Sequence, residues 1–255
     1  MQNHKEAVLQ QLVALSRSIG EPAKDLVILG DGNTSAMIDE NSFFVKASGS
    51  MLDGIGPDGF TEVAFAPVLD ILKRDSLSDS ELKAAFANAR VDPNSKHPSI
   101  ETVFHAIALS TCGAQFVAHS HPISINSIMC SQDARKALSG HMFSESALYL
   151  GPEAVIIDYA DPGLPIARAL ISQIEQYQQK WGQQPRVFYL LNHGMVALGQ
   201  SAKEVENITA MAVKSARILL GAALLGGPRF ISEEDVRRIV TRPDEEFRRK
   251  LANKS

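Results

Sequence analysis

The stretch AQFVAHSHPIS, residues 114–124, places two histidines two positions apart at the end of an apolar run. The run predicts a β-strand over residues 114–119, and in a strand residues i and i+2 point to the same face of the sheet. His119 and His121 would then aim both rings to one side. Pro122 ends the ladder of backbone hydrogen bonds, which places the pair at the rim of a sheet. Two hypotheses follow: a metal site, or a polar strand end that happens to contain histidine.

A third histidine has the same setting. The β-type run at 187–191 leads into Asn192-His193-Gly194, where the glycine lets the chain turn just after the ring. Three imidazoles at strand ends match a catalytic divalent-metal site, which keeps one coordination position open for substrate or water. The alternative is three unrelated loop histidines that hydrogen-bond to the backbone. The spacing alone leaves both interpretations open.

The order of the predicted elements favours an α/β fold. Hairpin strands come early and helices later, with single strands between them, which suggests a three-layer α/β/α arrangement around a largely antiparallel sheet. The predicted strands are 35–38, 42–47, 114–119, 154–158, 187–191 and 196–198, and the predicted helices are 1–20, 61–73, 78–90, 99–111, one after Gly163, and 201–225.

The chain shows no internal repeat and no linker-like tract. We therefore expect a single domain over residues 1–255, with a helical C-terminal extension from about residue 228. The most basic segment, residues 237–250, is interleaved with acidic residues and is interpreted as a solvated helical tail.

Composition indicates a soluble globular protein: 45% of the 255 residues are hydrophobic, 21% are charged, and the net charge is −4. This charge gives no sign of a nucleic-acid partner, which usually leaves a basic patch. No run approaches the ~18 apolar residues of a membrane span, and no signal peptide is recognisable. Two cysteines, Cys112 and Cys130, fit a reducing cytosol. We expect a cytoplasmic protein with neither a nucleic-acid nor a membrane partner.

A glutamate and a further histidine lie on the helix predicted from Ser99. Helical spacing places Glu101 and His105 one turn apart on the same face. Glu101 could serve the positive end of the helix dipole or cap the helix, or it could be a general base beside a metal. His105 is predicted to pack beneath the site or to orient Glu101 rather than to bind metal.

Two segments rich in glycine and hydroxyl groups, GDGNTS (30–35) and ASGS (47–50), could hold a phosphate with backbone N–H groups and short side chains. Hairpin turns use the same residues. Neither segment matches a Walker loop or a dinucleotide-binding motif.

Together and in this order, five motifs resemble the class II aldolase/adducin family over roughly residues 5–225. They are Gly32-Asn33-Thr34-Ser35, Ser48-Gly49, Pro98-Ser99-Ile100-Glu101, His119-Ser120-His121-Pro122 and Asn192-His193-Gly194. Within the family, GNTS, SGS and PSIET look most like the aldolase portion of bifunctional rhamnulose-1-phosphate aldolase/dehydrogenase proteins. We recognise no dehydrogenase domain in these 255 residues.

The resemblance implies the α/β/α fold, commonly a ring-shaped tetramer, and a small phosphorylated sugar as substrate. It implies retro-aldol cleavage of a ketose phosphate, with a divalent metal acting as a Lewis acid on the enediolate. The implied roles are metal ligands for His119, His121 and His193, usually to Zn²⁺ but also to Mn²⁺ or Co²⁺; acid/base for Glu101; and phosphate binding for Asn33, Ser48, Gly49 and Ser99.

The chain departs from the family pattern at two places. Many phosphate-binding members have a second serine where this chain has Ile100. Some fuculose-phosphate aldolases use a tyrosine, supplied across the subunit interface, that would fall near residues 141–145. His141 or Glu145 could replace it.

Alternative functions remain open on the sequence. Sugar-phosphate epimerases, keto-acid-phosphate decarboxylases and thiosugar-phosphate dehydratases need the same three histidines. Adducin-like scaffold proteins keep the fold without the site, and the presence of all three histidines and Glu101 argues against that interpretation.

Overall fold

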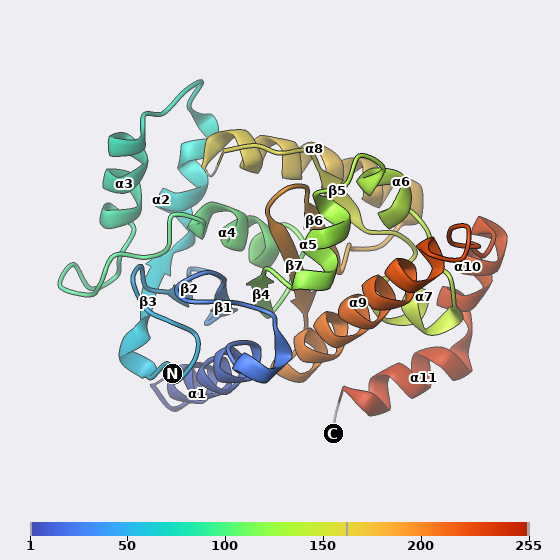
Figure 1. Cartoon of the computed structure of the whole chain (residues 1–255). Coiled ribbons are helices and arrows are strands. Elements are labelled where there is room, and N and C mark those ends of the chain that lie inside the picture. The colour runs from blue at the N-terminus through green and yellow to red at the C-terminus, as the bar shows by residue number, and fades with distance from the viewer. Residues whose placement is uncertain (1, 162, 254–255) are drawn as a thin grey trace.

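A mixed β-sheet runs through the middle of the computed structural model, which describes residues 2–161 and 163–253 (Figure 1). Within these residues seven strands form one sheet in the order β3-β2-β1-β4-β7-β6-β5. The pair β5–β6 is parallel and the other neighbouring pairs are antiparallel. The strands are β1 (Asn33–Met37), β2 (Ser42–Lys46), β3 (Phe60–Ala64), β4 (Phe116–Ser120), β5 (Val155–Ile157), β6 (Val187–Leu190) and β7 (Gly194–Gly199). The predicted largely antiparallel sheet is confirmed.

Helices cover both faces of this sheet, which confirms the predicted three-layer α/β/α fold. One face packs against α2, α4 and α8, and the other packs against α1, α5 and α9. The helices are α1 (Gln2–Ile19), α2 (Phe65–Leu69), α3 (Asp79–Asn88), α4 (Thr102–Ser110), α5 (Ile123–Met129), α6 (Ala134–Leu138), α7 (Ser144–Leu150), α8 (Leu164–Trp181), α9 (Ala202–Ala223), α10 (Glu233–Thr241) and α11 (Pro243–Ala252). Among the described residues, no helix combines the length and the apolar character that a membrane crossing requires.

Alternation along β4 divides its side chains between the two layers of helices. Phe116 and Ala118 belong to the core beneath α1 and α9, whereas Val117 belongs to the core beneath α4 and α8. The same period of two places His119 on the α4 side, where its ring lies 5.3 Å from that of Phe104. The His119 ring therefore lies near the C-terminal end of β4, on the side of the sheet that α4 covers.

The predicted helix over residues 61–73 was wrong at its start. Residues 60–64 form strand β3, which pairs antiparallel with β2, and the helical part begins only at Phe65. Thr61 and Val63 are buried on alternate positions of this strand, and both are β-branched. Pairing with β2 thus outweighs the local helical pattern. Helix α4 also begins later than predicted, at Thr102 instead of Ser99.

The C-terminal extension is helical, as predicted, but it is not simply solvated. Val236 and Ile239 of α10 pack against Ala147 of α7. The Arg249 side chain of α11 pairs with the carboxylate of Glu204 on α9 at 2.7 Å. Helices α10 and α11 therefore dock on the α9 side of the protein (Figure 1). The short helices α5, α6 and α7 were not predicted.

Candidate metal centre

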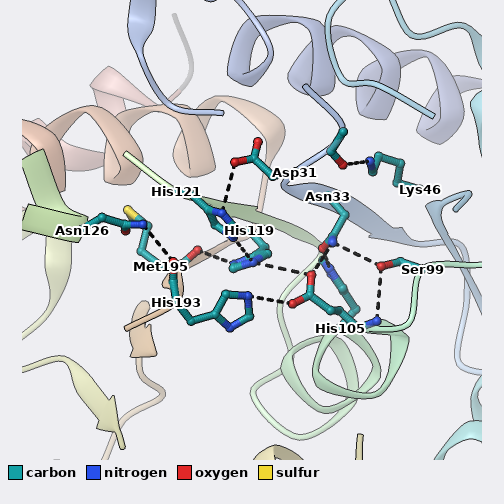
Figure 2. A network of polar contacts seen from close by, with 12 residues as sticks. Asp31, Asn33, Lys46, Ser99, His105, His119, His121, Asn126, His193 and Met195 are labelled. Atoms are coloured by element: carbon teal, nitrogen blue, oxygen red, sulfur yellow. Dashed lines mark hydrogen bonds and ion pairs between the residues drawn. The ribbon is translucent and has the colours of Figure 1, made fainter. Parts of the chain in front are cut away.

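Three histidine rings meet at the C-terminal end of β4. His119 is on the strand, His121 follows it directly, and His193 lies on the turn between β6 and β7. Their ring centroids are 4.7 Å (His119–His121), 4.8 Å (His119–His193) and 5.1 Å (His121–His193) apart. Figure 2 shows the three rings pointing toward one another. The three could hold one metal ion, so they are not unrelated loop histidines.

Hydrogen bonds assign the proton positions on two of the rings. The His119 Nδ1–H donates to the backbone carbonyl of Met195 at 2.9 Å, and the His121 Nδ1–H donates to the Asp31 carboxylate at 3.2 Å. Both Nε2 atoms then carry a lone pair, and they lie 2.9 Å apart. Two lone pairs at this distance repel each other unless both nitrogens bind the same cation.

The separation of these nitrogens also suits a metal ion. Imidazole nitrogens that lie about 2.0–2.1 Å from one tetrahedral ion are about 3.3 Å from each other. A small adjustment from 2.9 Å would reach that geometry. A hydrogen-bonded Nδ1–H that orients the ring is the usual support of a metal-binding histidine. The donor set therefore fits a divalent cation.

The protein environment favours the neutral imidazoles of His119 and His121. Burial lowers the pKa of His119 to about 4, although the nearby Glu101 carboxylate opposes this shift. Burial also lowers the pKa of His121, against the opposing effect of Asp31. Neutral imidazole is the form that binds metals, because its second nitrogen keeps a lone pair.

Glu101 lies between two of the histidines. Its Oε1 is 3.0 Å from Nε2 of His193, and its Oε2 is 3.5 Å from Nε2 of His119. Burial alone would raise its pKa, but the two histidines and a hydrogen bond from Asn33 outweigh burial and hold the pKa of this carboxyl below its ordinary value. Although Glu101 occupies the N-cap position of α4, its side chain makes no capping hydrogen bond. The capping interpretation was therefore wrong.

The predicted phosphate-binding residues lie along one rim beside Glu101. The Asn33 side-chain amide donates to Oγ of Ser99 at 3.2 Å. The turn that holds Ser48 and Gly49 runs beside Ser99, because the Ser48 N–H donates to the carbonyl of His97 at 2.8 Å. Asn33 and Ser99 are thus in contact, and Ser48 and Gly49 are exposed next to them.

Two charged residues of this region were missed by sequence reasoning. Asp31 orients His121, and Lys46 is only 4% exposed at the end of β2. The Lys46 ammonium donates to the carbonyls of Gly30 at 3.0 Å and Ser50 at 2.5 Å, so it joins the two glycine-rich turns. Burial lowers its pKa, whereas the nearby Asp31 carboxylate opposes the shift. The sequence offered one indication of both residues: Asp31 lies within GDGN, and Lys46 directly precedes ASGS.

The suggested replacements for the missing tyrosine have local partners. His141 is buried, with its two ring nitrogens 2.9 Å from Oγ of Ser146 and 3.1 Å from the carbonyl of Pro152. These contacts occupy both nitrogens, so this chain's own geometry does not favour His141 as a proton donor. The Glu145 carboxylate accepts from the Ser144 hydroxyl at 3.1 Å. Ile100 is 43% exposed and offers no hydroxyl.

Gly194 is required by the close approach of the histidines. A Cβ atom at this position would lie 2.4 Å from Cδ2 of His121 and 2.8 Å from Cε1 of His119. We expect Gly194→Ala to displace these rings and weaken divalent-metal affinity about 10–100-fold, the usual effect of disturbing the support of metal ligands. Gly221→Ala is the matched control, because a Cβ there meets open space. Chelator-competition titrations that give equal affinities for both variants would contradict this expectation.

Comparison with known proteins agrees with the fold and identifies the family. The family described as "Class II Aldolase and Adducin N-terminal domain" matches residues 10–220. A curated relative, the uncharacterized oxidoreductase YuxG of Bacillus subtilis (strain 168), is 25% identical over 216 residues. This match covers 82% of the chain and only 29% of the relative's length.

Solved structures of class II aldolases share the fold of this chain. The N-terminal class II aldolase domain of a conserved protein from Thermoplasma acidophilum has a TM-score of 0.65 and 26% identity, over 83% of this chain and 93% of that one. L-fuculose-1-phosphate aldolase from Thermus thermophilus has a TM-score of 0.60 and 21% identity, over 87% of this chain and all of that one (100%), a likeness that shows the fold. With a family match that spans most of its length, the chain belongs to the class II aldolase/adducin family.

Proposed function

We propose that the protein is a divalent-metal-dependent aldolase that cleaves a small ketose phosphate by retro-aldol chemistry. One observation carries the proposal: three imidazoles converge beside the buried, charged carboxylate of Glu101. The Nδ1–H groups of His119 and His121 donate to other partners, so the Nε2 atoms of these two rings keep a lone pair for a metal. Such a ligand set can hold a metal that acts as a Lewis acid, and such a carboxylate can transfer a proton.

In this proposal His119, His121 and His193 hold the cation. Zn²⁺ is our first choice because it suits imidazole ligands, and Mn²⁺ or Co²⁺ could occupy the same donor set. When bound, the ion would supply Lewis-acid stabilisation of the negative charge that develops on substrate oxygens.

Glu101 would move the proton. Retro-aldol cleavage removes a proton from a hydroxyl group, breaks the adjacent carbon–carbon bond, and leaves an electron pair on the fragment that holds the carbonyl. A proton must then be returned to the carbon next to that carbonyl, where the bond was broken. Glu101 is charged in the resting state, so it can accept the first proton and later give it back. The 2.6 Å hydrogen bond from Asn33 holds the carboxylate in place for both steps.

The substrate phosphate would lie along the rim formed by Asn33, Ser99 and the turn Ser48-Gly49. Gly49 has a left-handed backbone with φ of 80° in this exposed turn. The N–H groups of Ser48 and Ser50 donate to the carbonyls of His97 and Ala47, so the backbone N–H that this turn would offer to the phosphate is that of Gly49. The ammonium of Lys46 lies beneath this turn and adds positive charge to it. Ile100 contributes no hydroxyl, so fewer side-chain donors serve the phosphate than in many relatives.

A substrate screen tests the proposal. The protein is incubated with ketose phosphates and keto-acid phosphates, with and without Zn²⁺, and aldehyde, dihydroxyacetone phosphate and CO₂ are measured. We expect aldehyde and dihydroxyacetone phosphate from a ketose 1-phosphate only when the metal is present. Release of CO₂, or an epimerised or dehydrated product, would replace the lyase with one of the related enzymes. No turnover of any compound would favour a non-catalytic scaffold.

We also propose that the protein works as a homo-oligomer, specifically a tetramer. Beyond the family resemblance, exposed apolar side chains lie a few residues from Asp31 and His121 in the chain: Ile28 is 70% exposed, Leu29 78% and Ile123 65%. A second copy would cover them. Light scattering at micromolar concentration should give about four times the chain mass of 27.7 kDa. A strict monomer would remove any role for a neighbouring subunit.

We place the protein in the cytoplasm, again as a proposal. Cys112 is buried and Cys130 is exposed, and both are free thiols. Free thiols fit a reducing compartment. Fractionation of cells that express the protein would test this placement.

A further inference from the structure

A line of buried hydrogen bonds runs behind Glu101. The Ser35 hydroxyl lies 2.7 Å from Nδ1 of His105. The His105 Nε2 is in contact with Oδ1 of Asn33, and the Asn33 side-chain amide reaches the Glu101 carboxylate at 2.6 Å. His105 and Ser35 are 0% exposed and Asn33 is 4% exposed, so water does not compete for these contacts.

Secondary structure brings these four residues together. Asn33 and Ser35 are two positions apart on β1 and face α4, as the period of a strand requires. Glu101 and His105 are four positions apart at the start of α4, so both face β1. The two pairs therefore meet across the layer between the helix and the sheet.

The direction of every hydrogen bond in this line follows from the carboxylate. An ionised carboxylate only accepts, so the Asn33 amide must turn its NH₂ group toward Glu101 and its oxygen toward His105. The oxygen also only accepts, so His105 must carry its proton on Nε2. Burial lowers the pKa of His105 to about 3, so the ring is neutral, its Nδ1 accepts, and the Ser35 hydroxyl donates.

We propose that His105 is a positioning residue: with Ser35, it locks the side-chain amide of Asn33 in the orientation that holds the Glu101 carboxylate between His119 and His193. Without the Nε2–H, the buried Asn33 oxygen has no donor. Rotation of the amide would then turn this oxygen toward the Glu101 carboxylate, which repels it. The consequence for catalysis rests on the proposed function, whereas the proton position on His105 does not.

The first test measures that proton position in the full-length protein. Long-range ¹H–¹⁵N spectra of protein labelled with ¹⁵N-histidine should show a neutral His105 with its proton on Nε2, assigned by loss of its signals in His105→Gln. Ser35→Ala should shift the Nδ1 signal, because its donor is gone. Ser110→Ala, at the far end of α4, should leave the signal unchanged. A proton on Nδ1, a charged ring, or an Nδ1 signal indifferent to Ser35→Ala would overturn the proposal.

The second test separates positioning from packing. Glutamine can place an N–H near the position of Nε2, whereas leucine fills the space without a donor. We expect His105→Leu to lower turnover about 10–100-fold, the usual cost of losing a supporting hydrogen bond around a site, and His105→Gln to recover most of it. Metal content and melting temperature should be equal in the two variants.

Equal loss of turnover in both variants, or near-normal turnover in His105→Leu, would overturn the positioning role. If His105→Leu does not fold, the Ser35→Ala spectrum still decides the direction of the hydrogen bonds. If the wild-type protein cleaves no sugar phosphate, the proposed function fails while the result for the His105 proton stands.

Discussion

Replacing His121 with alanine is expected to abolish divalent-metal binding and turnover together. The variant removes one of three converging nitrogens, the one that lies 2.9 Å from Nε2 of His119. The two remaining imidazoles cannot form the three-ligand set of a catalytic metal site. The His121 side chain is 22% exposed, whereas that of His119 is completely buried, so His121→Ala separates loss of metal from loss of the core better than His119→Ala would.

Three measurements check this expectation. Elemental analysis should find about one equivalent of metal in the wild type and none in His121→Ala. Added Zn²⁺ should raise the melting temperature of the wild type only, because a ligand stabilises the folded state that binds it. His4→Ala is the control, since His4 lies on α1 and contacts the carbonyl of Ile38. A His121→Ala protein that keeps one tightly bound ion would remove the metal site from the proposal.

Glu101→Gln is expected to lower turnover by about 10²–10⁴-fold, the usual contribution of a general acid/base, while fold and metal content stay unchanged. Glutamine keeps the size of the side chain, and its oxygen can still accept the hydrogen bond from Asn33. It has no basic oxygen that could take a proton from the substrate. The loss should therefore appear in the rate and not in the melting temperature.

Glu81→Gln is the matched control for this experiment. Glu81 also lies at the start of a helix, in the first turn of α3, and its carboxylate accepts hydrogen bonds from Ser78. The Glu81→Gln variant should retain full activity with at most a small loss of stability. If Glu101→Gln turned over at a near-normal rate, proton transfer would have to pass through another group, and the role of Glu101 would be limited to hydrogen bonds that glutamine can also make.

Much of the fold and the main donors of the site could be predicted from local patterns. The apolar run before His119 predicts a strand, and two-residue spacing correctly places the rings of His119 and His121 together. Four-residue spacing correctly places Glu101 and His105 on one helical face. These predictions succeed because strand and helix periods follow from backbone geometry alone.

Other features are decided by contacts between distant parts of the chain. Residues 60–64 form a strand because β2 offers hydrogen-bonding partners, and no local pattern reports such pairing. The register that sets Asn33 opposite His119 brings β1 to the site, and the contact of Asn33 with His105 crosses 72 positions of sequence.

The sequence by itself named the side chains that we propose to bind a metal, move a proton or hold a phosphate, because residue type and spacing supplied the candidates and the resemblance to a family supplied their roles. Tertiary structure alone decided how they act on one another. Asp31 orients His121, Lys46 joins two turns, and Gly194 leaves room for the rings. The physical reason is that hydrogen-bond direction, burial and steric fit depend on neighbours that only packing of the helices on the sheet brings within reach.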